Sequence, residues 1–448
     1  MCALPKVWRA RKVCVCMRES NEGHAGRVDV LLGLQWGDEG KGKVVDVLAK
    51  QYNVIARFQG GPNAGHSLVF GKEKFVLHTI PSGIFRKSVQ NIVASGVVVD
   101  PVSFQQEVLQ LQSTGVDVRS QLKLSRRAHL ILPTHKLLDA FYEKQKGNQK
   151  IGSTLKGIGP TYTDKTARNG LRIGDVNLPN FKQKYEALKA HHLCIMGNEV
   201  DTTALAEAEK RWFEAIEVLK QYEFIDSEYL VNKYLSQGID LLAEGAQGSM
   251  LDVDFGSYPF VTSSNTICAG ACTGMGVAPR RIGRVYGIFK AYCTRVGAGP
   301  FPTELHDAVG EKMRVQGQEF GATTGRPRRC GWLDMVALKY AIMLNGVTHL
   351  IMTKADVLSN FETIRVCTSY TIHGVASDHV PFAAEQEVAL VYRDFKGWQE
   401  DISTCKTYEE LPAAFKEFMN YIEQETGVPI VIVSLGPDRD DTLIRSLA

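Results

Sequence analysis

A buried strand followed at once by a glycine-rich turn and a helix constrains this chain more than any other feature. An apolar, β-branched run begins at Val28, the glycines and lysines of Gly37–Lys43 form the turn, and apolar residues resume at Val44. Backbone N–H groups and the helix dipole converge at such a turn and bind anions. Its spacing matches the phosphate-binding loop GxxxxGK. Val44 stands where that loop has a magnesium-binding Ser or Thr, so Asp38 is the candidate metal ligand, because hard cations prefer carboxylate oxygens.

The composition is typical of a soluble globular protein, with 44% hydrophobic and 23% charged residues in a chain of 448. A net charge of +3 gives no general affinity for nucleic acid. No apolar run approaches the ~20 residues that span a bilayer. Ten scattered cysteines favour reduced thiols in a cytosolic protein over a zinc site. We therefore expect a cytoplasmic protein without nucleic-acid or membrane partners.

Residues 1–27 form an N-terminal extension that is basic, with no acidic residue before Glu19. A cationic targeting leader fits this composition, and so does a disordered tail or an upstream start codon. The lack of a clean apolar centre favours the second interpretation.

Strand-like and helix-like patterns alternate along the rest of the chain. The predicted strands are Val28–Leu34, Val54–Phe58, Asn91–Val98, Ile239–Ala243, Val285–Ala291, Thr348–Thr353, Ile364–Tyr370 and Pro429–Ser434. The predicted helices are Val44–Lys50, Pro101–Ser113, Phe181–His191, Thr203–Leu219, Trp332–Leu344 and Tyr408–Thr426. This alternation predicts an α/β fold: a large, mainly parallel central sheet flanked by helices, in a single P-loop-like domain with elaborate loops. Ligands of such sheets bind beyond the carboxyl ends of the strands.

A second motif, Thr353-Lys354-Ala355-Asp356, follows one of those strands. A TKxD or NKxD turn in this position reads guanine in many GTP-binding proteins, because one carboxylate accepts from both N1–H and the exocyclic amine. Asp356 as a plain helix cap is the alternative. Together with the phosphate loop, the motif favours guanine nucleotide binding.

Four further polar loops are candidates for substrate contacts. Gln59–His66 carries Asn63 and His66 on a glycine-rich loop, where the histidine is a candidate catalytic group. Gly321–Arg329 offers hydroxyls and three guanidiniums, which suit a carboxylate substrate. Glu244–Gly248 and Val261–Thr266 are rich in small polar groups and fit a purine, a phosphate or plain turns.

These motifs together resemble the adenylosuccinate synthetase family from about Val28 to the end of the chain. The resemblance rests on QWGDEGKGK (Gln35–Lys43), GGPNAGH (Gly60–His66), IGSTLKGIGP (Ile151–Pro160), EGAQG (Glu244–Gly248), VTSSNT (Val261–Thr266), AYCTRVGAGPFPTE (Ala291–Glu304), GATTGRPRR (Gly321–Arg329), TKADVL (Thr353–Leu358) and SLGPDR (Ser434–Arg439). The resemblance implies that residues 28–448 form one catalytic domain. Ser153, Lys156 and Leu435 differ from the residues that many relatives carry at these positions.

The resemblance implies a GTP-dependent ligase that joins IMP to L-aspartate, giving adenylosuccinate, GDP and phosphate, the first committed step from IMP to AMP. Asp38 would remove the N1 proton of IMP, whose O6 attacks the γ-phosphate to form 6-phosphoryl-IMP. His66 would be the acid partner, with Lys41 and Gln247 completing the catalytic set. One Mg²⁺ would be held by Asp38 and the carbonyl of Gly65.

The resemblance also assigns the binding residues. GTP would contact Gly37, Asp38, Glu39, Gly40, Lys41, Gly42, Lys43, Gly65, His66, Arg328, Lys354, Asp356, Ser434 and Gly436. IMP would contact Asp38, Asn63, Thr154, Arg168, Gln247, Thr262, Val296 and Arg326, with Arg168 reaching the neighbouring active site of a homodimer. Aspartate would contact Thr324, Arg326 and Arg328.

Two other functions share part of this pattern. A regulatory GTP switch would have the phosphate loop and TKxD, but would normally keep Ser or Thr in place of Val44 and would not need the loop Gly321–Arg329. A nucleotide-dependent ligase with another acceptor differs only in its response to IMP.

Overall fold

A ten-stranded sheet organises the computed structural model of this chain, which describes residues 25–70, 73–321, 325–383 and 386–445. Neighbouring strands are parallel, except that one edge strand, β20, runs antiparallel to β19. The order across the sheet is β20 (Thr442–Ile444), β19 (Ile430–Ser434), β15 (His349–Thr353), β11 (Ile282–Lys290), β1 (Val28–Gly33), β10 (Leu241–Glu244), β2 (Val54–Arg57), β5 (Gln90–Val93), β7 (Leu122–Ser125) and β9 (Glu223–Ile225). The predicted mainly parallel α/β sheet is confirmed. The prediction for residues 1–27 lies almost wholly outside the described residues.

The central strand β1 is buried on both faces, as its continuous apolar sequence requires. Val30 and Leu32 pack into the largest apolar cluster, which lies against α9 (Cys268–Met275) and α11 (Met335–Asn345). Leu31 points the other way and packs against α1 (Lys41–Leu48). Alternate side chains of a strand face opposite sides of the sheet, so one run of residues supplies both layers of the core.

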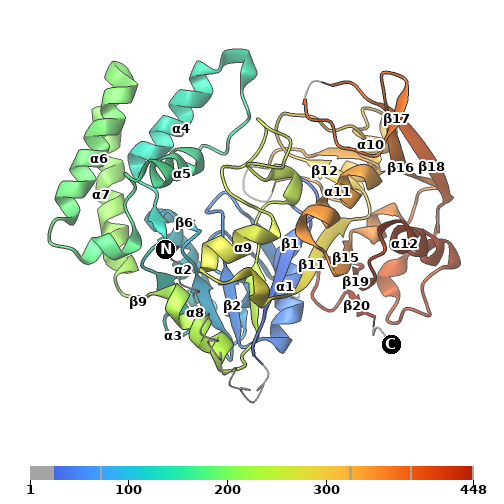
Figure 1. The fold of residues 1–448 in the computed structure, drawn as a ribbon, viewed down its shortest axis with the longest axis horizontal. Helices are drawn as coiled ribbons and strands as arrows, with labels where there is room; N and C mark the ends of the chain where they lie inside the picture. Colours follow the sequence, from blue (N-terminus) through green and yellow to red (C-terminus); the bar gives the residue numbers. More distant parts are fainter. Residues whose placement is uncertain (1–24, 71–72, 322–324, 384–385, 446–448) are drawn as a thin grey trace, which may run out of the picture.

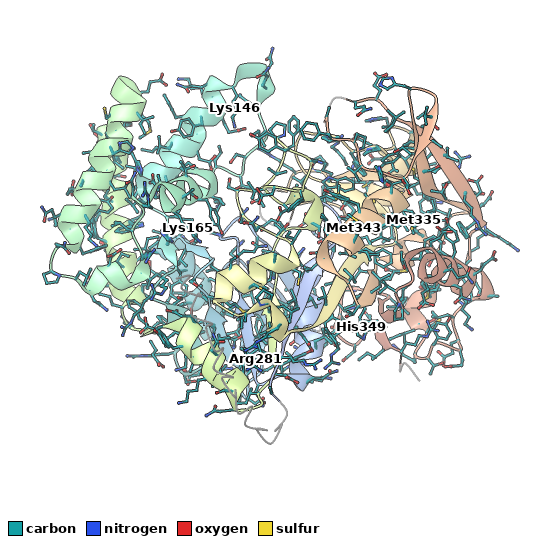
Figure 2. The ribbon with its side chains drawn as sticks, viewed as in Figure 1. Lys146, Lys165, Arg281, Met335, Met343 and His349 are labelled. Atoms are coloured by element: carbon teal, nitrogen blue, oxygen red, sulfur yellow. The ribbon has the colours of Figure 1, made fainter. Side chains whose placement is uncertain are left out.

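The helices cover both faces of the sheet and extend beyond its two edges (Figure 1). They are α1, α2 (Pro101–Gln112), α3 (Val118–Gln121), α4 (Pro133–Gln145), α5 (Ile158–Ala167), α6 (Phe181–Met196), α7 (Thr202–Leu219), α8 (Ser227–Ser236), α9, α10 (Ala308–Gln316), α11 and α12 (Ala413–Thr426). The group α4–α7 lies at the left of Figure 1, and α10–α12 lie at the right. Along α11, Met335 is buried and Met343 is exposed (Figure 2). No helix in the described ranges is long and apolar enough to cross a membrane.

Several predicted elements differ from the structure: the predicted strand Asn91–Val98 ends at Val93 in β5, and the predicted helix Tyr408–Thr426 begins at Ala413 in α12. Helix α1 begins at Lys41 rather than Val44, because Gly40 adopts a left-handed conformation (φ 93°) that starts the helix earlier. The predicted strand Ile364–Tyr370 lies in β16 (Thr363–Ile372), outside the central sheet. It forms a smaller sheet with β14 (Leu333–Asp334), β17 (Val375–Ser377) and β18 (Ala389–Lys396). Its partly exposed burial pattern is typical of a sheet with one solvated face.

Short paired strands shape the loops above the central sheet. A hairpin is formed by β3 (His66–Phe70) and β4 (Glu73–Leu77), a ribbon by β12 (Cys293–Arg295) and β13 (Arg329–Gly331), and a parallel pair by β6 (Val98–Val99) and β8 (His129–Leu130). The loops after β1, β2, β10, β11, β15 and β19 all leave the same edge, because these neighbouring strands are parallel. The motifs of the sequence therefore meet at one place.

Candidate active site

The phosphate loop joins β1 to α1 and is built around its own carboxylate. Glu39 is fully buried, and its Oε1 accepts hydrogen bonds from the N–H of Gly37 at 2.9 Å and of Gln35 at 3.2 Å. Lys41 donates to the other oxygen, Oε2, at 2.5 Å. The side chain of Glu39 thus holds the loop in shape, and contacts with a ligand are left to the backbone N–H groups at the start of α1.

Glycines around Glu39 allow this close packing. A Cβ on Gly33 would lie 2.2 Å from Glu39 Oε2, and one on Gly248 would lie 2.6 Å from Oε1. A Cβ on Gly42, in the first turn of α1, would lie 2.9 Å from the Cβ of His66. The loop that ends in Gly65 and His66 therefore approaches the N-terminus of α1 directly.

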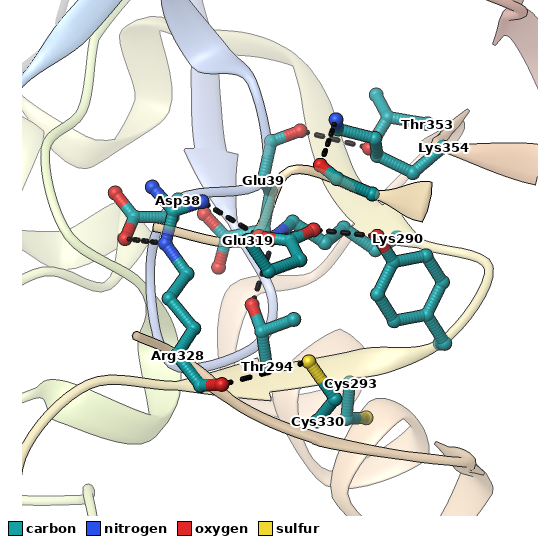
Figure 3. A network of polar contacts seen from close by, with 12 residues as sticks. Asp38, Glu39, Lys290, Cys293, Thr294, Glu319, Arg328, Cys330, Thr353 and Lys354 are labelled. Atoms are coloured by element: carbon teal, nitrogen blue, oxygen red, sulfur yellow. Dashed lines mark hydrogen bonds and ion pairs between the residues drawn. The ribbon is translucent and has the colours of Figure 1, made fainter. Parts of the chain in front are cut away.

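Asp38 projects from the phosphate loop into a network of charges (Figure 3). It has φ 61°, its side chain is 33% exposed, and its Oδ2 accepts from Nε of Arg328 at 2.8 Å. Arg328 also donates through Nη1 to the buried carboxylate of Glu319 at 2.6 Å. Asp38, the predicted base, is therefore in direct contact with Arg328, which was predicted to bind GTP and aspartate, although the two residues are far apart in sequence.

Two residues that the sequence patterns did not single out fix this network. Lys290, at the end of β11, donates to both oxygens of Glu319 at 2.9 Å, and the hydroxyl of Tyr292 donates to Oε1 at 2.5 Å. Burial alone would raise the pKa of Glu319, but the charges of Lys290 and Arg328 outweigh it and lower this pKa to about 2. The sequence did contain one signal for this network: Lys290 ends an otherwise apolar strand, and a buried charge requires a polar partner.

His66 is buried and is the first residue of β3, so it stands where the predicted glycine-rich loop ends rather than within it. The preceding glycines let the strand start at the sheet edge, where Nδ1 of His66 lies 2.5 Å from Oε1 of Glu244. Ser82 donates to Glu244 through its N–H and its hydroxyl. Burial and the nearby charge of Arg57 lower the pKa of His66 to about 4. Its Nε2 is buried without a hydrogen-bond partner among the described residues, so one ring nitrogen is held and the other is available.

The predicted IMP ligands Gln247 and Asn63 are in contact. Gln247 follows β10 with φ 55° and donates through Nε2 to Oδ1 of Asn63 at 3.1 Å. Within the described residues its Oε1 is buried without a partner. Thr262 is partly buried, and its N–H donates to the carbonyl of Leu251. Val296 is 37% exposed, so an apolar side chain remains available for contact.

Thr154 and Arg168 flank α5, and both are exposed in the single chain. Arg168 caps the C-terminus of this helix with φ 67°.

A buried cluster anchors α5: Asp164 Oδ2 lies 2.8 Å from Nε2 of both His135 and His192. His135 accepts from the N–H of Leu132 through Nδ1, so its Nε2 carries the proton that it donates to Asp164. The histidine contacts lower the pKa of Asp164 despite its burial.

Asp356 lies just beyond β15, in a short 3-10 helix, Ala355–Leu358. Its Oδ1 is buried and has no hydrogen-bond partner within the described ranges. Burial raises the pKa of Asp356 to about 6, against the opposing charges of Lys354 and Lys43. Lys354 donates to the carbonyl of Gly317 at 2.9 Å, and the neighbouring strand β19 ends at Ser434. An unsatisfied buried acceptor is the group that a ligand with paired N–H donors would satisfy.

The predicted aspartate loop is described only in part, because Thr324 lies outside the described residues. Arg326 is exposed, and its carbonyl accepts from the N–H of Gly321 at 2.8 Å. Arg329 is different from its neighbours: its guanidinium is bound by Glu304 and by the carbonyls of Gly297 and Gly299. The guanidiniums of Arg328 and Arg329 are therefore both held by carboxylates of this chain, Arg328 by Asp38 and Glu319 and Arg329 by Glu304.

The fold and this arrangement of residues are those of a nucleotide-binding α/β protein, with a glycine-rich loop at the carboxyl edge of a parallel sheet and the buried carboxylate of Asp356 two strands away. The family model described as adenylosuccinate synthetase matches residues 30–443. Adenylosuccinate synthetase of Flavobacterium johnsoniae is 60% identical over 421 residues, covering 93% of this chain and 100% of that protein. That of Parabacteroides distasonis is 57% identical over 419 residues, covering 94% and 99%.

Solved structures agree. The fully ligated adenylosuccinate synthetase of Plasmodium falciparum superposes with a TM-score of 0.88 at 36% identity, covering 94% of this chain and all of that one. A cyanophage S-2L succinoaminodeoxyadenylate synthetase, bound to dGMP and dATP, shares the fold with a TM-score of 0.63 at 20% identity. This chain belongs to the adenylosuccinate synthetase family.

Proposed function

We propose that this chain joins IMP to L-aspartate at the expense of GTP, forming adenylosuccinate, GDP and phosphate on the way to AMP. Membership of the family supports the reaction, and one observation supports its location in this chain. Asp38, Arg328, His66, Gln247 and Asp356 come from distant motifs and gather at one edge of the sheet.

Asp38 acts as the base in this proposal. The hypoxanthine oxygen of IMP is a poor leaving group until it is phosphorylated, and it becomes nucleophilic when the N1 proton is removed. A carboxylate accepts hydrogen bonds and protons. Arg328 orients Asp38 through Oδ2, and the other oxygen, Oδ1, would take the proton. The reaction needs positioning and charge stabilisation more than covalent catalysis, as is general for phosphoryl transfer.

His66 acts as the acid partner. Glu244 holds Nδ1, so Nε2 is the nitrogen that faces a ligand. In the unliganded protein burial keeps the imidazole neutral, with its pKa lowered to about 4. The anionic phosphates of GTP favour a proton on Nε2, and Glu244 stabilises the resulting imidazolium. The proton can then neutralise the oxygen that leaves with GDP.

The residues present fit a Mg²⁺ ion. Asp38 supplies a carboxylate oxygen and Gly65 a carbonyl oxygen, the ligands that this ion prefers. The close approach of Gly42 to His66 brings the loop that carries Gly65 to the phosphate loop. When bound, the ion would neutralise phosphate charge.

The remaining contacts follow the pockets. IMP would lie against Asn63, Thr154, Gln247, Thr262, Val296 and Arg326, and aspartate against Thr324, Arg326 and Arg328. GTP would lie along Gly37–Lys43, with its base at Lys354, Asp356, Ser434 and Gly436. In a homodimer the exposed Arg168 would reach the IMP phosphate of the neighbouring subunit. The free thiols of the described cysteines support a reducing, cytoplasmic location.

Isotope transfer tests the reaction directly. IMP labelled with ¹⁸O at C6 is incubated with GTP, Mg²⁺ and aspartate, and the released phosphate is analysed by mass spectrometry. The proposal predicts one labelled oxygen in the phosphate and strict dependence on aspartate for product. A GTP switch would release unlabelled phosphate and ignore both IMP and aspartate, which would overturn the proposal.

A further inference from the structure

Two lysines of the phosphate loop take different directions. In a GxxxxGK loop the final lysine ordinarily reaches the phosphates. Here Lys41 stays within the loop and binds Glu39. Lys43 is also buried, but its Nζ donates to Ser434 Oγ at 2.8 Å, to the Gly436 carbonyl at 2.7 Å and to the Asp441 carbonyl at 3.0 Å. An ammonium has three N–H donors, so these three acceptors satisfy Lys43 completely.

All three acceptors belong to one segment, the connection Ser434–Asp441 between β19 and β20. The connection is folded around Asp441, whose carbonyl accepts from the N–H of Leu435 and whose Oδ2 accepts from the N–H of Asp438. Gly436 is packed so closely that a Cβ there would lie 2.4 Å from Oδ2 of Asp441. Lys43 ties this turn to helix α1, together with Arg439 of the turn, whose Nε lies 3.0 Å from Oδ2 of Asp46 in the same helix.

The same segment lies beside the purine-reading carboxylate. β19 pairs in parallel with β15, so Ser434 and Asp356 follow adjacent strand ends. Asp356, Asp438 and Asp441 all act electrostatically on Lys43. The lysine therefore supplies positive charge near these three carboxylates, while its hydrogen bonds hold the connection that begins beside Asp356.

We infer that Lys43 is a positioning residue for the base pocket: it holds the Ser434–Asp441 connection in the shape that receives guanine, and it is not a phosphate ligand. This inference rests on the proposed function, in which Asp356 reads guanine. It gives the two lysines of one motif different roles: Lys41 binds Glu39 within the phosphate loop, and Lys43 supports the base site.

Equilibrium binding of two fragments separates the two roles of Lys43. Guanosine carries the base without phosphates, and inorganic tripolyphosphate carries the phosphates without a base. For Lys43→Met we expect the Kd values of guanosine and GTP to rise by the same factor, at least about tenfold, because hydrogen bonds to a charged group are lost. The Kd of tripolyphosphate should stay within about twofold of the wild-type value, as expected for a site away from the change.

Matched variants complete the test. Lys50→Met removes an exposed lysine just beyond the same helix and should change none of the three Kd values. Lys43→Arg keeps the charge and should recover part of the guanosine affinity. Lys43→Gln keeps an N–H donor without the charge and should weaken guanosine but not tripolyphosphate, which keeps the inference testable if Lys43→Met does not fold.

A selective loss of tripolyphosphate binding in Lys43→Met, with guanosine unchanged, would overturn the inference. Equal weakening of both fragments would also overturn it. Because these measurements need no turnover, they are independent of the proposed reaction. If the wild-type protein binds guanosine but does not form product from IMP and aspartate, the proposed function fails and the role of Lys43 is still decided.

Discussion

The contact between Glu244 and His66 allows us to predict how far kcat falls when Glu244 loses its charge. Glu244 is fully buried, and its Oε1 lies 2.5 Å from Nδ1 of His66. In Glu244→Gln the amide oxygen can still accept from Nδ1, so the hydrogen bond remains but loses its charge. A charged hydrogen bond exceeds a neutral one by about 1–2 kcal/mol. That difference applies only when His66 is protonated in the transition state, so kcat should fall about 5- to 30-fold.

Steady-state kinetics of adenylosuccinate formation, followed by the absorbance change of the purine ring, measure this effect. The KM values of GTP, IMP and aspartate should change little, because Glu244 is expected to touch none of them. The variant will also lose stability, because its amide N–H₂ faces the N–H of Ser82. A buried donor left without an acceptor costs about 1–3 kcal/mol. Thermal unfolding must therefore accompany the kinetics.

Glu107→Gln is the matched control. Glu107 is another buried glutamate, and it accepts from the N–H groups of His78, Thr79 and Ile80. Its replacement creates a similar donor clash but leaves His66 and Glu244 in place, so stability should fall while kcat stays near wild type. Wild-type kcat in Glu244→Gln, or an equal loss of kcat in Glu107→Gln, would refute the positioning of His66 by Glu244.

Three further predictions concern other residues of the site. Asp38→Ala should abolish product formation and isotope transfer with an unchanged Tm, since Asp38 is partly exposed; normal turnover would remove it as the base. Arg326→Leu should raise the KM of aspartate about 10- to 100-fold, the contribution of a charged hydrogen bond, while the KM of GTP stays constant. Asp356 has a pKa raised to about 6 by burial, and only its ionised form accepts from guanine, so the KM of GTP should rise about tenfold per pH unit below that value. Asp356→Asn should abolish this pH dependence and favour xanthosine triphosphate over GTP, and a retained preference for GTP would exclude Asp356 from the base site.

Local patterns predicted the frame of this protein. The buried strand Val28–Gly33 and the glycines of the phosphate loop are encoded within one short stretch, Val28–Lys43, because strand periodicity, turn conformation and helix start depend on neighbours in sequence. The meeting of the motifs at one edge followed from the parallel sheet alone. Ile364–Tyr370 was correctly predicted as a strand, but its sequence does not specify its partners, which lie in the smaller sheet.

The family resemblance named the residues of the site, and tertiary structure decided what each side chain touches. The spacing of the loop favours Lys43 as a phosphate ligand, yet Lys43 binds a turn almost four hundred residues away. Arg328 donates to Asp38 and Lys290 donates to Glu319, and no local sequence pattern predicts either contact. The physical reason is that a charge buried by folding must find an opposite charge or a polar partner nearby, and that partner is set by packing of the whole chain rather than by spacing along it.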